Sequence, residues 1–163
     1  MKSLLILRHG KSSWKHLELP DHDRPLNKRG KRDALRMGKL LREEKIIPEI
    51  MISSTAERAR KTAEAAARAS AYTGKIILKK SLYAAGPEAY IEALHTILNK
   101  YSIAMVVGHN PAIEELVELL TGETHLMPTC SLASINLSVD NWLDVNNQGK
   151  GKLVDIWLPR DLR

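Results

Sequence analysis

Short runs of apolar residues alternate along this chain with longer stretches in which apolar residues recur at helical spacing. The short runs are typical of buried strands and lie at residues 4–7, 50–52, 76–78 and 103–107. The amphipathic stretches predict helices at residues 28–44, 56–70 and 87–100, and a further helix after Pro111. Strands that alternate with helices favour an α/β sandwich with a mainly parallel sheet.

Single residues indicate where these helices begin and what they bury. Asn27 is an expected N-cap of the first helix. The hydroxyl residues 53–55 are a start signal for the second helix. In the third helix, Ile91, Leu94 and Leu98 follow one another on one side, so all three are expected to face the core.

The C-terminal part of the chain predicts a closing hairpin at the sheet edge. Residues 132–139 alternate between apolar and polar, and residues 153–158 form a partner strand across a polar turn that contains residues 146–149. The chain has 163 residues and shows no linker or internal repeat. A single domain spanning residues 1–163 is therefore expected.

Composition narrows the class of protein. Hydrophobic residues make up 44% and charged residues 27% of the chain, which excludes collagen-like, disulfide-scaffold and wholly disordered proteins. The formal net charge of +6 favours anionic partners. Aromatic residues are only 4% and phenylalanine is absent, so the stacking platforms of single-strand binders are hard to build. We therefore expect no nucleic-acid partner.

The single cysteine and the lengths of the apolar runs bear on disulfide formation and on the cellular location of the protein. The lone Cys130 cannot form an internal disulfide and is expected to pack as a small apolar residue. No apolar run is long enough to span a bilayer or to form a signal peptide. A cytoplasmic location without a membrane partner is expected.

Two histidines follow predicted buried strands and are the strongest candidates for chemistry. His9 comes directly after the first strand, within Arg8-His9-Gly10, and His109 follows the run at 103–107. Ligands of open α/β sheets bind beyond the carboxyl ends of the strands. His9, His109, Arg8 and Arg58 are therefore expected to converge on one pocket. The remaining histidines are expected to be structural or solvated: His16, His22, His95 and His125.

These residue types suit phosphoryl transfer. A neutral imidazole is a nucleophile near neutral pH, so His9 could attack phosphorus and carry the phosphoryl group as a covalent intermediate. Arg8 and Arg58 offer planar donor forks that suit phosphoryl oxygens, and His109 adds another donor. Gly10 is expected to let the backbone approach the phosphate. Two guanidiniums and an imidazole could replace a metal, so no cofactor is expected.

The chain resembles the histidine phosphatase superfamily, also called phosphoglycerate-mutase-like. The resemblance rests on three segments in order, "LLILRHG", "SSTAERARKTAE" and "VVGHNP", and covers the chain to about Thr121. It implies a three-layer α/β/α sandwich in which His9 is phosphorylated, Arg8 and Arg58 bind phosphate and His109 is the second pocket histidine. The pattern selects Arg58 rather than Arg60, because the family arginine directly precedes an alanine.

Within the superfamily, the chain looks most like the short SixA-type branch, named for phosphohistidine phosphatases that act on phosphorelay proteins. The segment "DHDRPLNKRG", the segment "TGETHLMPTCSLASINL" and the lack of mutase insertions carry this likeness. It implies a phosphorylated protein as partner. Arg24, in the first of these segments, is expected either at the pocket mouth or in a solvated loop.

One family feature is missing. Many relatives carry a glutamate as general acid after the third strand, but this chain has "LYAAGPEAY" there. Glu88 could substitute, although a role in balancing the helix dipole is favoured. A sugar alkoxide needs a proton donor in order to leave, whereas imidazole, with a pKa of about 6.5, leaves more easily. The gap therefore favours a phosphohistidine substrate.

Three hypotheses follow. The first is a metal-free phosphatase that acts through phospho-His9 on phosphohistidine in a protein. The second keeps this chemistry for small phosphate esters or nucleotides, with Glu88 or water as the proton donor. The third is a non-catalytic module that binds phosphoproteins or nucleic acid. The loop residues Asp21, His22 and Asp23 could be written as metal ligands, but neighbours on one loop rarely converge, so no metal is expected.

An imidazole nucleophile also predicts a pH dependence. Because His9 must be unprotonated to attack, and because the ordinary pKa of imidazole is about 6.5, activity is expected to fall on the acidic side of the range from about pH 5 to about pH 8.

Overall fold

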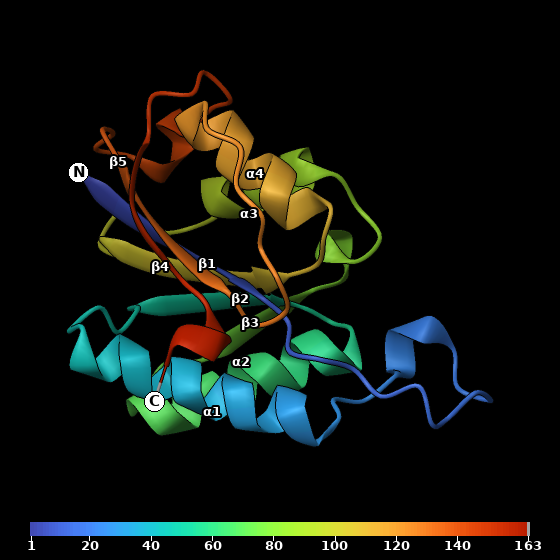
Figure 1. Cartoon of the computed structure of the whole chain (residues 1–163). Coiled ribbons are helices and arrows are strands. Elements are labelled where there is room, and N and C mark those ends of the chain that lie inside the picture. The colour runs from blue at the N-terminus through green and yellow to red at the C-terminus, as the bar shows by residue number, and fades with distance from the viewer. Residues whose placement is uncertain (163) are drawn as a thin grey trace.

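The chain folds into a six-stranded mixed sheet between two layers of helices, and the computed structural model describes residues 1–162. The strands are β1 (Lys2–Arg8), β2 (Ile50–Ser54), β3 (Ile76–Lys79), β4 (Ile103–Gly108), β5 (Leu132–Leu137) and β6 (Lys152–Trp157). The helices are α1 (Lys28–Glu43), α2 (Glu57–Ser70), α3 (Pro87–His95) and α4 (Ala112–Thr121). The predicted three-layer α/β/α sandwich is confirmed (Figure 1).

The sheet has the strand order β3-β2-β4-β1-β5-β6. Neighbouring strands among β1, β2, β3 and β4 are parallel, whereas β5 pairs antiparallel with both β1 and β6. The predicted closing hairpin is therefore formed by β5 and β6 at one edge. No helix in the described residues 1–162 is both long and apolar enough to cross a bilayer.

Alternation along β1 divides the core between the two helical layers. Leu4 and Ile6 belong to the cluster packed on α3 and α4, whereas Leu5 and Leu7 belong to the cluster on α1 and α2. Successive side chains of a strand point to opposite faces, so this continuous apolar run serves both layers at once. Figure 1 shows α1 and α2 below the sheet and α3 and α4 above it.

The end of α3 differs from the sequence-based expectation. Helix α3 ends at His95, because the N–H and the hydroxyl of Thr96 both donate to the carbonyl of Ala93. The chain then turns, which leaves Leu98 61% exposed and buries Ile97 instead. The expectation that Leu98 faces the core was therefore wrong.

The connection between β5 and β6 is longer and less polar than a simple turn. It contains Trp142, which is fully buried and donates from Nε1 to the carbonyl of Tyr101 at 2.8 Å. A connection rich in polar residues thus contributes the side chain of Trp142 to the hydrophobic core. Cys130 is also fully buried, as expected.

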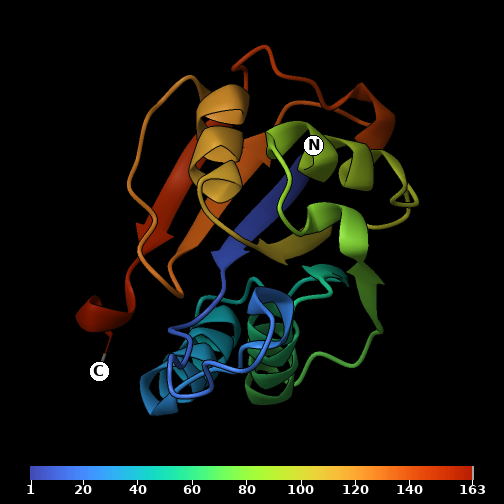
Figure 2. The same cartoon turned by 90° about the vertical axis from the view of Figure 1, so that its right-hand side faces the viewer.

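The carboxyl ends of β1, β2 and β4 meet at one edge of the sheet. The segment between β1 and α1, drawn in blue, projects from the molecule at this edge (Figure 1), and Figure 2 looks onto it. A 3-10 helix, η1 (Asp21–Asp23), lies within that segment. Asn27 then caps α1, with its Oδ1 accepting from the N–H of Gly30 at 2.8 Å, as predicted.

Candidate active site

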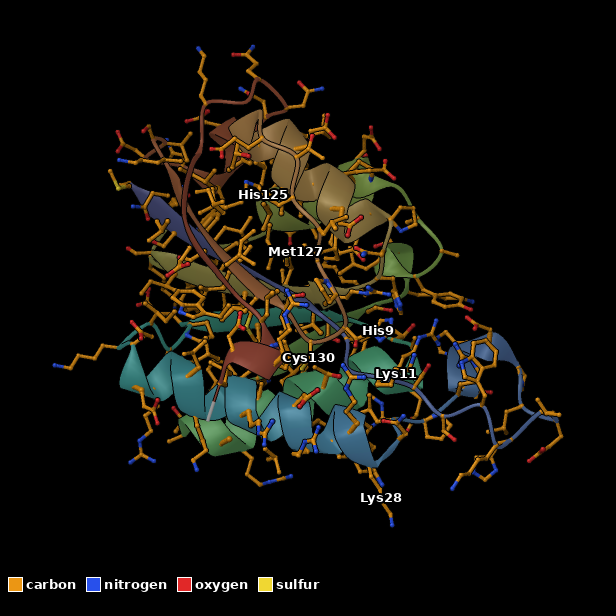
Figure 3. All side chains as sticks on the ribbon, in the orientation of Figure 1. His9, Lys11, Lys28, His125, Met127 and Cys130 are labelled. Atoms are coloured by element: carbon orange, nitrogen blue, oxygen red, sulfur yellow. The ribbon has the colours of Figure 1, made fainter. Side chains whose placement is uncertain are left out.

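Strand register brings the two candidate histidines together. β1 and β4 pair with Arg8 opposite Gly108, so His9 and His109 are the next residues along two adjacent strands. The N–H of His9 donates to the carbonyl of Gly108 at 3.0 Å. The two imidazole rings lie with their centroids 5.1 Å apart, and both residues are buried. Figure 3 shows His9 at the sheet edge where β1 ends.

His9 is held in the state that a nucleophile needs. Its Nδ1 lies 2.7 Å from the carbonyl oxygen of Gly10, so Nδ1 carries the proton and donates it to that carbonyl. The lone pair of Nε2 is therefore free to attack. Burial, together with the neighbouring His109 and the positive charges of Arg58 and Arg8, lowers the pKa of His9 to about 3. The ring is neutral at physiological pH.

This pKa changes the expected pH dependence. An unshifted imidazole predicts activity that falls within pH 5–8, whereas protonation of His9 is moved below this range. The fall in activity expected from the ordinary pKa of histidine does not apply to this side chain.

His109 is held in the same tautomer as His9. The hydroxyl of Ser54 accepts from the N–H of Ala56 at 3.2 Å and lies 2.8 Å from His109 Nε2. Nε2 is the acceptor that lies within reach of the hydroxyl hydrogen, so the hydroxyl donates to Nε2 and the ring proton is on Nδ1. Burial, followed by the charge of Arg58, lowers the pKa of His109 to about 4. His109 is therefore a neutral hydrogen-bond donor.

The backbone of His109 is positioned by Tyr90. The hydroxyl of this fully buried tyrosine accepts from the N–H of His109 at 3.1 Å and donates to the carbonyl of Leu82 at 3.0 Å. The contact requires glycine at position 108, because a Cβ there would lie 2.0 Å from the tyrosine hydroxyl.

Gly108→Ala is expected to lower the thermal unfolding midpoint by several degrees and to reduce turnover at least tenfold. The added methyl group displaces a tyrosine that the core holds, at a cost of about 1–3 kcal/mol. Gly86→Ala is the matched control, because a Cβ there meets only the flexible end of Glu88. Calorimetry and a turnover assay check both variants, and equal midpoints for the two would contradict the role given to the Gly108–Tyr90 contact.

The two arginines are anchored by their terminal nitrogens. Arg8 Nη1 donates to the carbonyl of Met127 at 2.9 Å. Arg58 donates from Nη1 to the backbone carbonyl of Asp21 at 2.7 Å and from Nη2 to the carboxylate of Asp21 at 3.0 Å. The hydroxyl of Thr62 connects α2 to the nucleophile segment, since it donates to the carbonyl of Arg58 and accepts from the N–H of Gly10.

Three buried donors of this cluster have no hydrogen-bond partner within residues 1–162: Arg8 Nε, Arg58 Nε and His109 Nδ1. They belong to the same side chains whose charges or rings act on His9. Buried donors are normally satisfied, so three orphaned donors around one nucleophile indicate a site for an anion with several acceptor oxygens. A phosphoryl group has this chemistry.

Two further candidates, Gly10 and Glu88, have contacts that do not fit the roles expected of them. The N–H of Gly10 is used by Thr62, and a Cβ at position 10 would meet the backbone of Gly30 at 2.9 Å, so helix packing rather than phosphate approach requires this glycine. Glu88 is exposed in the first turn of α3 and lines a separate hollow beside His95. The position of Glu88 therefore does not support a role as proton donor.

Arg24 is connected to the site through the carboxylate of Asp21. It is buried, donates from Nε to Asp21 Oδ1 at 3.1 Å and from Nη1 to Ser12 Oγ at 2.8 Å, and stacks on Trp14 with its Cζ 3.6 Å from the ring centroid. It therefore holds the projecting loop, and it reaches Arg58 only through the Asp21 carboxylate.

Sequence reasoning missed the polar groups that η1 brings to the pocket mouth. Asp21 Oδ2 accepts from Arg58 and from the hydroxyl of Tyr83, and the ring of Tyr83 packs edge-on against His109 with centroids 5.5 Å apart. His22 Nε2 lies 2.9 Å from Thr55 Oγ1. Within the described chain, no three potential metal-ligating side chains of the searched types gather in one place.

The two buried histidines predict a pH-dependent stability. Their pKa values are below the ordinary 6.5 in the folded chain, so as the pH falls below about 6.5 the unfolded chain takes up protons first. The free energy of unfolding should therefore fall by up to about 1.4 kcal/mol per pH unit for each histidine, from pH 6.5 down to about pH 4.

Urea unfolding at pH 7.0 and pH 5.0 measures this loss. His9→Asn should remove roughly half of the part due to the two histidines, while His125→Asn, which alters a half-buried imidazole paired with Glu123 outside the pocket, should not. Identical pH slopes for the wild type and His9→Asn would show that His9 is not neutralised by burial.

Comparison with known proteins identifies the class. Residues 4–82 match the family model described as the histidine phosphatase superfamily, branch 1. An uncharacterised chloroplast protein of Arabidopsis thaliana is 33% identical over 150 residues, which cover 86% of this chain and 69% of that protein. The chain therefore belongs to the histidine phosphatase superfamily, and it is a phosphatase.

Solved structures refine this placement. A protein of Agrobacterium tumefaciens described as a phosphohistidine phosphatase, SixA, superposes with a TM-score of 0.83 at 28% identity, covering 97% of this chain and 98% of that one. The protein histidine phosphatase SixA complexed with tungstate has the same fold, with a TM-score of 0.83, 23% identity and 98% coverage of both chains. The fold is of the SixA type.

Proposed function

We propose that this phosphatase hydrolyses phosphohistidine in a phosphorylated protein and that it does so through a phospho-His9 intermediate. The observation that carries the proposal is the set of orphaned buried donors on Arg8, Arg58 and His109 around a neutral imidazole. The SixA proteins that share the fold are described as acting on phosphohistidine, which supports the substrate assignment.

The reaction takes two displacements. In the first, the lone pair of His9 Nε2 forms a bond to phosphorus while the bond from phosphorus to the leaving nitrogen breaks, and the leaving ring keeps that electron pair. In the second, water attacks the phospho-His9, the N–P bond breaks and inorganic phosphate departs. Nδ1 of His9 keeps its proton throughout, because the Gly10 carbonyl accepts it.

Arg8, Arg58 and the N–H of His109 stabilise the negative charge on the phosphoryl group during transfer. Loose phosphoryl transfer depends on positioning and on positive charge at the equatorial oxygens, and two guanidiniums with one imidazole N–H supply both. Arg8 and Arg58 are already held by Met127 and Asp21, so they need not reorganise during the reaction. We therefore assign no step to a metal ion.

Neither Glu88 nor Asp21 is suited to protonate a leaving group, which favours the phosphohistidine substrate. Glu88 lies elsewhere, and hydrogen bonds from Tyr83 and Arg58 hold the pKa of Asp21 well below its usual range, so that this carboxylate cannot donate a proton at neutral pH. Imidazole is a far better leaving group than a sugar alkoxide when no acid is at hand.

Turnover of two substrates tests the proposal. A phosphohistidine peptide should be hydrolysed with a kcat/KM at least about 100-fold above that for 3-phosphoglycerate. A preference for 3-phosphoglycerate would reject phosphohistidine as the substrate and favour the small-ester alternative.

A further inference from the structure

The mouth of the pocket carries a carboxylate that the reaction scheme leaves unused. Asp21 Oδ2 accepts from Arg58 Nη2 at 3.0 Å and from the Tyr83 hydroxyl at 2.7 Å, and Asp21 Oδ1 accepts from Arg24 Nε at 3.1 Å. Its side chain is nonetheless 53% exposed, whereas the side chain of Arg58 is only 8% exposed. Asp21 is thus exposed to solvent, whereas the two arginines that donate to it are buried.

The charge of this carboxylate is fixed. The hydrogen bond from Tyr83, followed by the bond and the charge of Arg58, holds the pKa of Asp21 well below its usual range. The pocket therefore has a cationic floor, formed by Arg8 and Arg58, and one permanent negative charge at its opening.

Asp21 is exposed at the open side of the pocket, where we expect the leaving group to depart. His9 is buried and attacks from the closed side, so an in-line displacement sends the leaving group out on the opposite, open side. Asp21 and Tyr83 are the groups attached there to the phosphate-binding side chains, through the Arg58 guanidinium and through the edge-on contact of Tyr83 with His109.

The carboxylate still has room for one more donor. Two carboxylate oxygens offer about four acceptor positions, and the protein uses three of them. A leaving group with an N–H can take the remaining one, whereas a leaving group with its own negative charge meets repulsion.

We propose that Asp21 selects the leaving group: it accepts a hydrogen bond from the free ring N–H of a protonated phosphohistidine and disfavours phosphate compounds whose leaving group carries a carboxylate. This inference rests on the proposed function and names the feature of the substrate that the site reads. When the P–N bond of the protonated ring breaks, the electron pair goes to the ring nitrogen, the other nitrogen keeps its proton, and neutral imidazole leaves. No general acid is needed for this step.

The test compares ratios of kcat/KM within each variant. p-Nitrophenyl phosphate is the reference, because its leaving group has no N–H to offer and carries no carboxylate; a phosphohistidine peptide and 3-phosphoglycerate are the two probes. Asp21→Asn should lower the phosphohistidine ratio about tenfold, the size expected for loss of one charge-assisted hydrogen bond, and should raise the 3-phosphoglycerate ratio severalfold. Asp21→Glu, which keeps the charge, should stay within about threefold of the wild type.

Controls separate selection from support of the fold. Glu18→Gln removes a carboxylate of the same loop that pairs with His16, and it should leave both ratios unchanged. Thermal midpoints verify that each variant is folded. If Asp21→Asn lowers kcat/KM for all substrates by the same factor, Asp21 only holds Arg58 and the inference is overturned.

Failure of the proposed function would look different. The wild type would then hydrolyse the phosphohistidine peptide no faster than p-nitrophenyl phosphate, irrespective of Asp21. An unchanged 3-phosphoglycerate ratio in Asp21→Asn would overturn the selection of leaving groups even if phosphohistidine proved to be the substrate.

Discussion

Replacing His9 by glutamine is expected to lower kcat at least about 10⁴-fold, because glutamine offers no lone pair that can attack phosphorus. Wild-type protein stopped in acid-free denaturant during turnover of a labelled substrate should carry phosphate that is labile in acid and stable in base. The variant should carry none. Mass spectrometry of the intact chain and a turnover assay measure the two effects.

A second histidine variant makes this result specific. His16→Gln changes an exposed imidazole on the projecting loop and should keep both turnover and the covalent phosphate. If His9→Gln still acquired acid-labile phosphate at the wild-type rate, another residue would be the nucleophile and the proposed mechanism would fail.

Removing the guanidinium of Arg58 should lower kcat/KM by about 10³-fold, the lower range found when a transition-state arginine is lost. Arg58→Lys should recover little of this, because an ammonium cannot donate to Asp21 and to a phosphoryl oxygen from a fixed planar fork. Steady-state kinetics with p-nitrophenyl phosphate measure both variants.

The neighbouring arginine provides the control. Arg60 also lies on α2, but it pairs with Glu57 and Glu64 on the surface of its own helix. Arg60→Ala should therefore change kcat/KM by less than about twofold. A loss comparable to that of Arg58→Ala would mean that Arg60 also binds the phosphoryl group, contrary to the assignment to Arg58.

The layers of the fold could be predicted because the apolar runs are strong local signals. The β1 run is buried on both faces, and such runs occur almost only in strands covered by helices on both sides. The end of α3 could not be predicted, since it depends on Thr96 bonding back to Ala93 rather than on periodicity. Trp142 was overlooked because its neighbours are polar.

The candidate site likewise has one part that the sequence predicts and one part that it does not. His9 and His109 could be expected near each other because both follow parallel strands, and the structure brings them together. The contact between Asp21 and Tyr83 joins two exposed segments 62 positions apart, and no local sequence pattern predicts it. The functions of polar loop residues depend on tertiary contacts, which composition and spacing do not encode.

The pairing of Arg8 with Gly108 has a consequence for folding experiments. Since side chains alternate along a strand, displacing β1 by one residue against β4 would send one imidazole to the other face of the sheet and destroy the phosphate pocket. Recovery of enzymatic activity after dilution from urea therefore reports correct alignment of two central strands, an event that far-ultraviolet spectroscopy alone does not distinguish from misaligned pairing.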